Sequence, residues 1–164
     1  MNDRLSKKVL NHVRDQQQLL ISLLHDLVTA ESPSADPAVH EQARHVFMSG
    51  LIELGWHVIE AGVADGPRHV YARPARRDRQ SALQLIVGHY DTVWPIGTIA
   101  DLPFTVDGNI IRGPGVFDMK GGLVQLVIAI KTLQELNLEP EATNNRDGEN
   151  TPGNASESDH EPTE

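Results

Sequence analysis

The 164-residue sequence contains no cysteine, which excludes a disulfide scaffold, a thiolate metal site and a cysteine nucleophile. Aromatic residues make up only 4% of it, and no apolar run approaches the roughly 20 residues of a membrane-spanning helix. Basic residues are scarce as well, with 14 Lys and Arg against 23 Asp and Glu and a net charge of -9. Nucleic acids and anionic membranes attract positively charged surfaces. We therefore expect neither of them as a partner.

The negative charge is concentrated near the C-terminus. Residues 139–164 contain eight acidic residues and one arginine, whereas residues 1–138 carry a net charge of only -2. The C-terminal segment shows no hydrophobic periodicity, as is typical of disordered chains. The sequence thus predicts a folded part over residues 1–138 and an acidic disordered tail over residues 139–164. Residues 1–30 do not match a secretory signal, so we expect a cytoplasmic protein.

Hydrophobic spacing predicts an α/β fold, with a mixed sheet flanked by helices. Apolar residues at helical intervals indicate helices over residues 3–30, 37–54 and 119–136. The last of these is apolar on nearly all sides and predicts burial on more than one side. Strand patterns cover residues 56–61, 69–73 and 83–88, and a hairpin is predicted around Asp107-Gly108-Asn109. The run at 83–88 is largely apolar, so we expect it to form a buried central strand.

The segment after this run, Gly88-His89-Tyr90-Asp91, has residues that could carry chemistry. Alternate side chains of extended chain share a face, so His89 and Asp91 are expected to point the same way. Open α/β sheets bind ligands at the carboxyl ends of their strands. A carboxylate that accepts one ring N–H of a histidine leaves the other nitrogen for a metal or a proton. The motif is short, and a loop with a hydrogen-bonded histidine is the structural alternative.

A second segment, Gly113-Pro114-Gly115-Val116-Phe117-Asp118-Met119-Lys120-Gly121-Gly122, precedes the last predicted helix. Asp118 could cap this helix, which would stabilise it by about 1 kcal/mol. Two glycines in a first turn cost about 1 kcal/mol each relative to alanine, which indicates close approach of the backbone to another element or a ligand. The segment lacks the Gly-Lys-Ser/Thr of a phosphate loop and the third glycine of a dinucleotide fingerprint. Asp118 with His89 therefore favours a metal, and Lys120 is expected to face solvent.

The two motifs, in this order, resemble those of the co-catalytic zinc metallopeptidase family. That family includes glutamate carboxypeptidase, acetylornithine deacetylase, succinyl-diaminopimelate desuccinylase and aminoacylase. The resemblance covers residues 15–138, includes Glu31-Ser32-Pro33-Ser34 and is closest to the glutamate carboxypeptidase branch. It implies a catalytic domain with two zinc ions, in which His89 binds one metal, Asp118 bridges both, and Asp91 is the active-site acid that orients His89. It also implies a cis peptide bond after Asp118.

The sequence departs from this family after the last helix. The family continues with a strand that ends in a Glu-Glu pair, of which the first is the general base and the second a metal ligand. Here the chain reads Leu138-Glu139-Pro140-Glu141, without a strand pattern. A catalytic zinc site uses about three protein ligands, and His89 and Asp118 are two for a pair of metals.

We therefore expect an N-terminal piece of a metal-dependent hydrolase that acts on the amide bond of a peptide or N-acyl amino acid. The chain alone is expected to be inactive and to bind one zinc ion or none. The unrelated tail is what a truncation or frameshift would produce. The alternatives are a non-catalytic binding module and a truncated, non-functional gene product. The oligomeric state is left open.

Overall fold

The computed structural model describes residues 3–62, 68–76 and 84–138 and confirms the α/β class. The elements follow in the order α1 (Asp3–Asp15), α2 (Gln17–Thr29), a 3₁₀ turn (Pro37–Val39), α3 (Glu41–Glu53), β1 (Trp56–Gly62), β2 (Arg68–Pro74), α4 (Thr98–Asp101), β3 (Thr105–Asp107), β4 (Ile110–Arg112), a π-type turn (Val116–Lys120) and α5 (Gly121–Glu135). The predicted tail, residues 139–164, lies outside the described residues, so its disorder and the boundary at residue 138 stay predictions.

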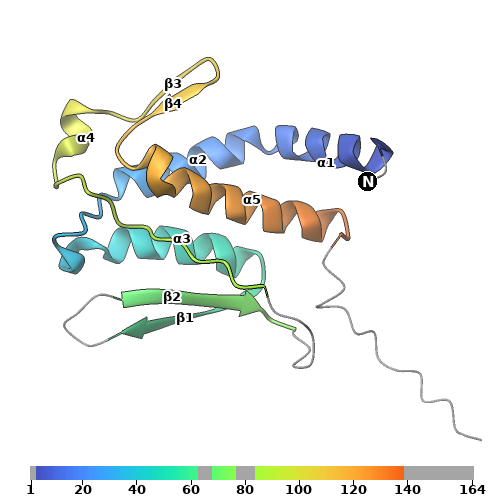
Figure 1. Cartoon of the computed structure of the whole chain (residues 1–164), viewed down its shortest axis with the longest axis horizontal. Helices are drawn as coiled ribbons and strands as arrows, with labels where there is room; N and C mark the ends of the chain where they lie inside the picture. Colours follow the sequence, from blue (N-terminus) through green and yellow to red (C-terminus); the bar gives the residue numbers. More distant parts are fainter. Residues whose placement is uncertain (1–2, 63–67, 77–83, 139–164) are drawn as a thin grey trace, which may run out of the picture.

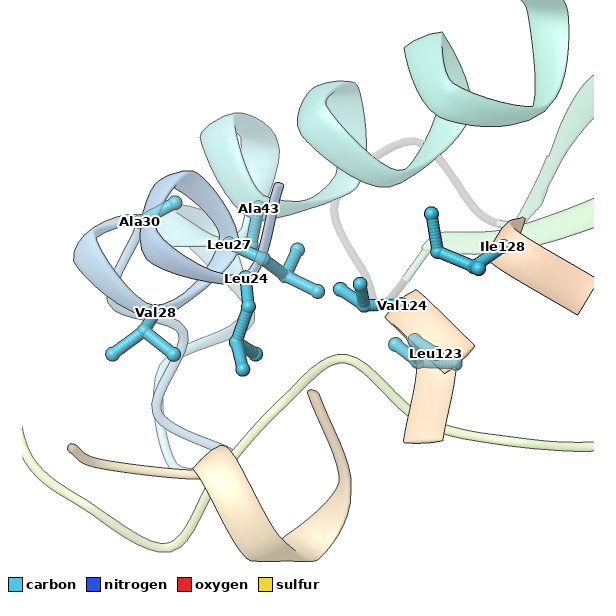
Figure 2. Packing of buried hydrophobic residues seen from close by; sticks show 8 residues of the cluster. All are labelled: Leu24, Leu27, Val28, Ala30, Ala43, Leu123, Val124 and Ile128. Carbon is cyan, nitrogen blue, oxygen red and sulfur yellow. The ribbon is translucent and has the colours of Figure 1, made fainter. Parts of the chain in front are cut away.

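The buried residues of the hydrophobic core come from α2 and its C-terminal end, α3 and α5. α5 packs against α1, α2 and α3. The β1–β2 hairpin packs against α3 on the side that faces away from α5 (Figure 1). The burial of α5 on more than one side is thus confirmed. Burying one leucine or valine side chain contributes about 1.5–3 kcal/mol, and the core contains eight buried apolar side chains (Figure 2): Leu24, Leu27, Val28, Ala30, Ala43, Leu123, Val124 and Ile128.

Two antiparallel hairpins form as the sequence predicts. β1 pairs with β2 from Trp56 opposite Pro74 to Gly62 opposite Arg68, and the turn between them, residues 63–67, lies outside the described residues. β3 pairs with β4 around Gly108, whose φ of +58° is a conformation that favours glycine. The turn residues therefore determine where the second hairpin reverses.

The buried central strand predicted over residues 83–88 is wrong. Leu83 lies outside the described residues, and residues 84–88 form no strand. Leu85 and Val87 are 80% and 77% exposed. A wholly apolar strand is buried only where neighbouring strands and helices cover it, but the two described sheets are separate hairpins that do not pair with this run.

The single helix predicted over residues 3–30 is two helices, with a break at Gln16. Gln16 is buried, and its Nε2 donates to Glu135 Oε2 on α5 at 2.9 Å. His12 Nε2 contacts the same carboxylate oxygen at 2.7 Å. A buried amide must find hydrogen-bond partners, and Gln16 finds them in Glu135 on α5 and in His12 on α1, whose Nε2 lies 2.9 Å from Gln16 Nε2. Within residues 3–62, 68–76 and 84–138, no helix has the length and apolar character required to cross a membrane.

Candidate metal site

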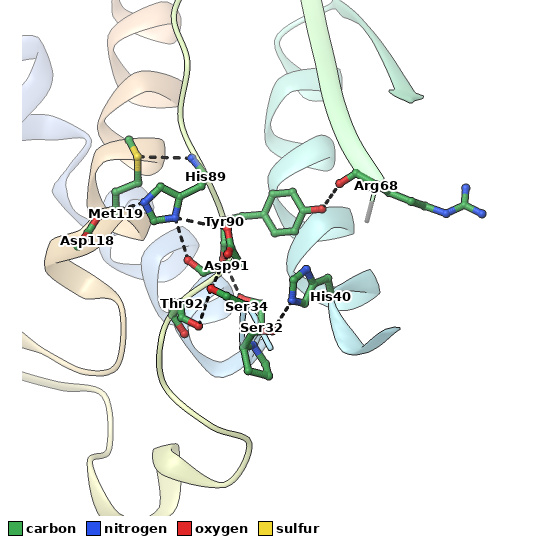
Figure 3. A network of polar contacts seen from close by, with 11 residues as sticks. Ser32, Ser34, His40, Arg68, His89, Tyr90, Asp91, Thr92, Asp118 and Met119 are labelled. Atoms are coloured by element: carbon green, nitrogen blue, oxygen red, sulfur yellow. Dashed lines mark hydrogen bonds and ion pairs between the residues drawn. The ribbon is translucent and has the colours of Figure 1, made fainter. Parts of the chain in front are cut away.

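His89 and Asp118, 29 positions apart in the sequence, face each other in the structure (Figure 3). His89 Nε2 lies 3.1 Å from Asp118 Oδ1, and the two side chains are 46% and 78% exposed. The backbone N–H of His89 also donates to the sulfur of Met119 at 3.4 Å. The structure therefore brings together the two residues that were predicted as metal ligands, in a place that solvent reaches.

The other ring nitrogen of His89 is held by Asp91. Nδ1 lies 2.9 Å from the backbone carbonyl oxygen of Asp91 and 3.5 Å from its carboxylate Oδ1. A carbonyl oxygen can only accept, so Nδ1 carries the proton and donates it. Asp91 thus sits beside His89 as predicted, although the closer contact is made by its main chain. This leaves Nε2 as the nitrogen available to a metal.

The electrostatics of the pair favour a cation between His89 and Asp118. A neutral imidazole donates from one nitrogen only, yet both nitrogens of His89 face acceptor oxygens. Burial lowers the pKa of His89, but the hydrogen bond to the Asp91 carbonyl and the two carboxylates outweigh it and raise the pKa overall. Burial raises the pKa of Asp91, whereas the hydrogen bond from Ser34 lowers it, and the net effect is a lowered pKa. Either a proton or a metal ion would satisfy the opposed nitrogen and oxygen.

Asp118 lies in an irregular turn rather than at a helix cap. Its φ and ψ are −130° and 101°, the Asp118–Met119 peptide is cis as the resemblance implied, and neither helical segment here has a side-chain cap. The N-cap alternative for Asp118 is therefore wrong. The side chain is directed toward His89 instead (Figure 3).

Glycines allow this turn to form. A Cβ on Gly121 would lie 2.5 Å from the Val116 carbonyl oxygen, and a Cβ on Gly115 would lie 2.4 Å from Thr92 Cγ2. The close approach predicted from the adjacent glycines is therefore confirmed for Gly121, and it is an approach to the chain's own backbone. Gly115 brings the Asp118 turn against the segment that contains Asp91.

Lys120 was expected to face solvent, and this expectation is wrong. The side chain is only 1% exposed, and Nζ donates to the carbonyl oxygens of Leu27 at 2.8 Å and Ala30 at 2.9 Å. Burial lowers the pKa of Lys120 to about 8, against the opposing charge of Glu31. The last carbonyls of a helix lack intrahelical partners and carry partial negative charge, so they suit a cation. Local sequence carries no sign of this contact because the acceptors lie about 90 positions away.

Ser34 is a second residue to which sequence reasoning assigned no role. Its Oγ donates to Asp91 Oδ2 at 2.5 Å, and its backbone N–H donates to the Thr92 carbonyl at 2.8 Å. Thr92 N–H in turn donates to the Ser32 carbonyl at 2.8 Å, which makes a short parallel bridge between the two segments. The Glu31-Ser32-Pro33-Ser34 motif was the one available indication of this contact.

The donor set fits zinc, which binds histidine nitrogen and carboxylate oxygen. His89 Nε2 and an Asp118 oxygen are the two donors that the structure brings together. In the described part of the chain, no group of three or more His, Cys, Asp or Glu side chains could hold a metal. The pair is therefore a partial site when judged by the described residues alone.

A family model and several curated proteins match the sequence. The sequence model described as Peptidase family M20/M25/M40 matches residues 85–144, which include His89, Asp91 and Asp118. Carboxypeptidase G2 from a Pseudomonas species is 32% identical over 124 residues, 74% of this chain and 29% of the relative. N-formyl-4-amino-5-aminomethyl-2-methylpyrimidine deformylase from Halalkalibacterium halodurans is 30% identical over 143 residues, 81% of this chain and 32% of the relative.

The deformylase of the same name from Bacillus subtilis is 28% identical over 144 residues, 82% of this chain and 32% of the relative. The chain therefore spans about a third of the length of the curated relatives it matches.

Proposed function

The chain belongs to peptidase family M20/M25/M40, and from this membership we propose that it supplies part of the metal site of an amide-cleaving hydrolase. The observation that carries the proposal is the 3.1 Å approach of His89 Nε2 to Asp118 Oδ1, with Asp91 on the other side of the imidazole. Two segments that match one family model converge at this point, and the ligand types suit zinc.

Each of the three residues has a defined task. The backbone carbonyl of Asp91 accepts a hydrogen bond from His89 Nδ1, which fixes the tautomer and the orientation of the ring. His89 then presents Nε2, and Asp118 presents its carboxylate, to the same point. His89 and Asp118 would hold zinc, which when bound would polarise the scissile carbonyl and lower the pKa of a bound water. His89 can bind a metal only when Nε2 carries no proton, because a metal ligand has to be deprotonated.

The substrate class follows from what the relatives' names have in common. One relative is a carboxypeptidase, and two are deformylases of an N-formyl compound. Both names describe removal of an acyl group from nitrogen. We therefore propose a peptide or a small N-acyl compound, such as an N-acyl amino acid, as substrate, and neither nucleic acid nor a membrane as partner. Cytoplasmic residence stays a prediction.

The 164-residue chain by itself is proposed to be inactive. His89 and Asp118 are two of the roughly three ligands that one catalytic zinc needs. A general base must also lie within hydrogen-bond reach of the attacking water. Among the described residues, Asp91 is the carboxylate next to this pair, and it is occupied by Ser34 and the imidazole.

A chimera tests the proposal. Residues 85–138 would replace the matching stretch of the Pseudomonas carboxypeptidase, and carboxypeptidase activity and bound zinc would be measured with a circular dichroism spectrum as the check on folding. We expect an active chimera that loses activity on His89→Ala or Asp118→Asn and keeps it on Asp107→Asn, an exposed position of the β3–β4 hairpin within the same stretch. A folded, zinc-loaded chimera that both substitutions leave active would refute the assignment. Turnover of N-acyl amino acids by the unmodified chain would refute its inactivity.

A further inference from the structure

The two halves of the candidate metal site are both fastened to one short stretch of chain, residues 27–34, which we call the α2 exit segment. This segment begins in the last turn of α2 and ends at Ser34. We propose that Lys120 and Ser34 are positioning residues, which hold Asp118 and His89 in register by anchoring both to the α2 exit segment. The proposal rests on the proposed function, because it assigns how that site is kept in shape.

Lys120 anchors the half that contains Asp118. It lies two residues after Asp118, and its Nζ donates to the carbonyls of Leu27 and Ala30 at 2.8 and 2.9 Å. The lysine is the largest fully buried side chain in the described structure. Breaking a buried polar contact leaves unsatisfied groups. The Asp118 turn therefore cannot move away from α2 without breaking both hydrogen bonds.

Ser34 anchors the half that contains His89. Its hydroxyl donates to Asp91 Oδ2, and Asp91 holds His89 Nδ1 through its carbonyl. The parallel bridge between Pro33 and Thr92 fixes the backbone on which this contact is made. Figure 3 shows Ser34, Asp91 and His89 in sequence, with Asp118 on the far side of the imidazole. Removal of the Ser34 hydroxyl therefore releases one carboxylate oxygen next to the His89 ring.

Because both anchors end on the α2 exit segment, the separation of His89 Nε2 from Asp118 is set by a closed loop of contacts. The loop runs from Asp118 through Lys120 to residues 27–34, and through Ser34 and Asp91 back to His89. Loss of either anchor should widen the range of positions that His89 adopts relative to Asp118. Orientation of a ligand by residues behind it is worth about 10- to 100-fold in metal affinity.

The first test uses the full chain without metal and observes the imidazole directly. Ring ¹⁵N–¹H spectra would be recorded for the eight histidines, with His89 assigned from its loss in His89→Gln. Ser34→Ala and Lys120→Met are expected to shift or broaden the His89 signals. Ser34→Thr, which keeps a hydroxyl, should restore them. Matched controls away from the site, Ser49→Ala and Lys131→Met, should leave them unchanged.

The outcomes separate the two proposals. If folded Ser34→Ala leaves the His89 signals where the wild type has them, the positioning role is refuted. This variant decides the matter alone if Lys120→Met does not fold, because Ser34 is exposed and its loss leaves no buried gap. Zinc titration follows, with about a 10-fold weaker affinity expected for Ser34→Ala. A chimera with the Pseudomonas carboxypeptidase that stays active in both His89→Ala and Asp118→Asn refutes the proposed function, while shifted His89 signals in Ser34→Ala still support the positioning.

Discussion

Replacement of Gly115 by alanine should be among the most damaging single substitutions in the folded part of the chain. Gly115 is buried and has a φ of +70°, where a side chain costs roughly 1–2 kcal/mol. The added Cβ would lie 2.4 Å from Thr92 Cγ2, far inside van der Waals contact, and Thr92 is itself buried. Overpacking of this kind costs about 1–3 kcal/mol. We therefore expect the free energy of unfolding to fall by about 2–5 kcal/mol.

A matched substitution separates the two contributions. Gly55 has nearly the same φ, +74°, but a Cβ there would meet nothing within 4 Å. Gly55→Ala should therefore cost only the backbone contribution, roughly 1–2 kcal/mol. Both variants would be unfolded in urea and followed by circular dichroism, with the midpoint and slope compared to wild type. If Gly115→Ala is no more destabilising than Gly55→Ala, the tight packing of the Asp118 turn on Thr92 is refuted.

Two further outcomes follow from the site and the core. Burial lowers the pKa of His89, but the hydrogen bond to the Asp91 carbonyl and the carboxylates of Asp118 and Asp91 raise it overall, so these contacts stabilise the fold at acid pH and the stabilisation is lost as the pH rises through the raised pKa. Asp118→Asn should lower the pKa of His89 in an NMR titration, and an unchanged value would contradict the pairing. Leu27 is 1% exposed, so Leu27→Ala should cost about 2–5 kcal/mol in urea unfolding. Leu10 is 48% exposed, and Leu10→Ala should change the free energy of unfolding by about 0.5 kcal/mol or less. Equal losses of unfolding free energy at Leu10 and Leu27 would argue against the described core.

Elements that depend on nearby residues could be predicted from the sequence. The β3–β4 hairpin forms because Gly108 sits in a reversal between two short apolar runs, and α3 ends just before Gly55 with its positive φ. Elements that depend on distant partners could not. The run at 84–88 has a strand's composition, but composition does not say whether neighbours are present to pair with it. Gln16, at the break between α1 and α2, hydrogen-bonds to a carboxylate on α5 that lies 119 positions away in the sequence.

In the candidate site, too, some features could be predicted from the sequence and others could not. The motifs around His89 and Asp118 were recognisable, and their convergence followed from the family resemblance rather than from residue spacing. The contacts that support the site were not predictable, because Lys120 reads as an ordinary surface residue until the carbonyls of Leu27 and Ala30 are placed around its ammonium group. Ser34 likewise gains its role only when residue 91 is folded against it.

Zinc titration calorimetry on the purified chain tests the central claim, that His89 and Asp118 form one metal-binding pair. We expect a single binding event that His89→Ala and Asp118→Ala each abolish, while His69→Ala on β2 leaves it unchanged. Both site variants should keep the wild-type circular dichroism spectrum, since the two side chains are solvent-exposed. Zinc binding that survives both His89→Ala and Asp118→Ala would show that these two side chains are not the metal-binding pair.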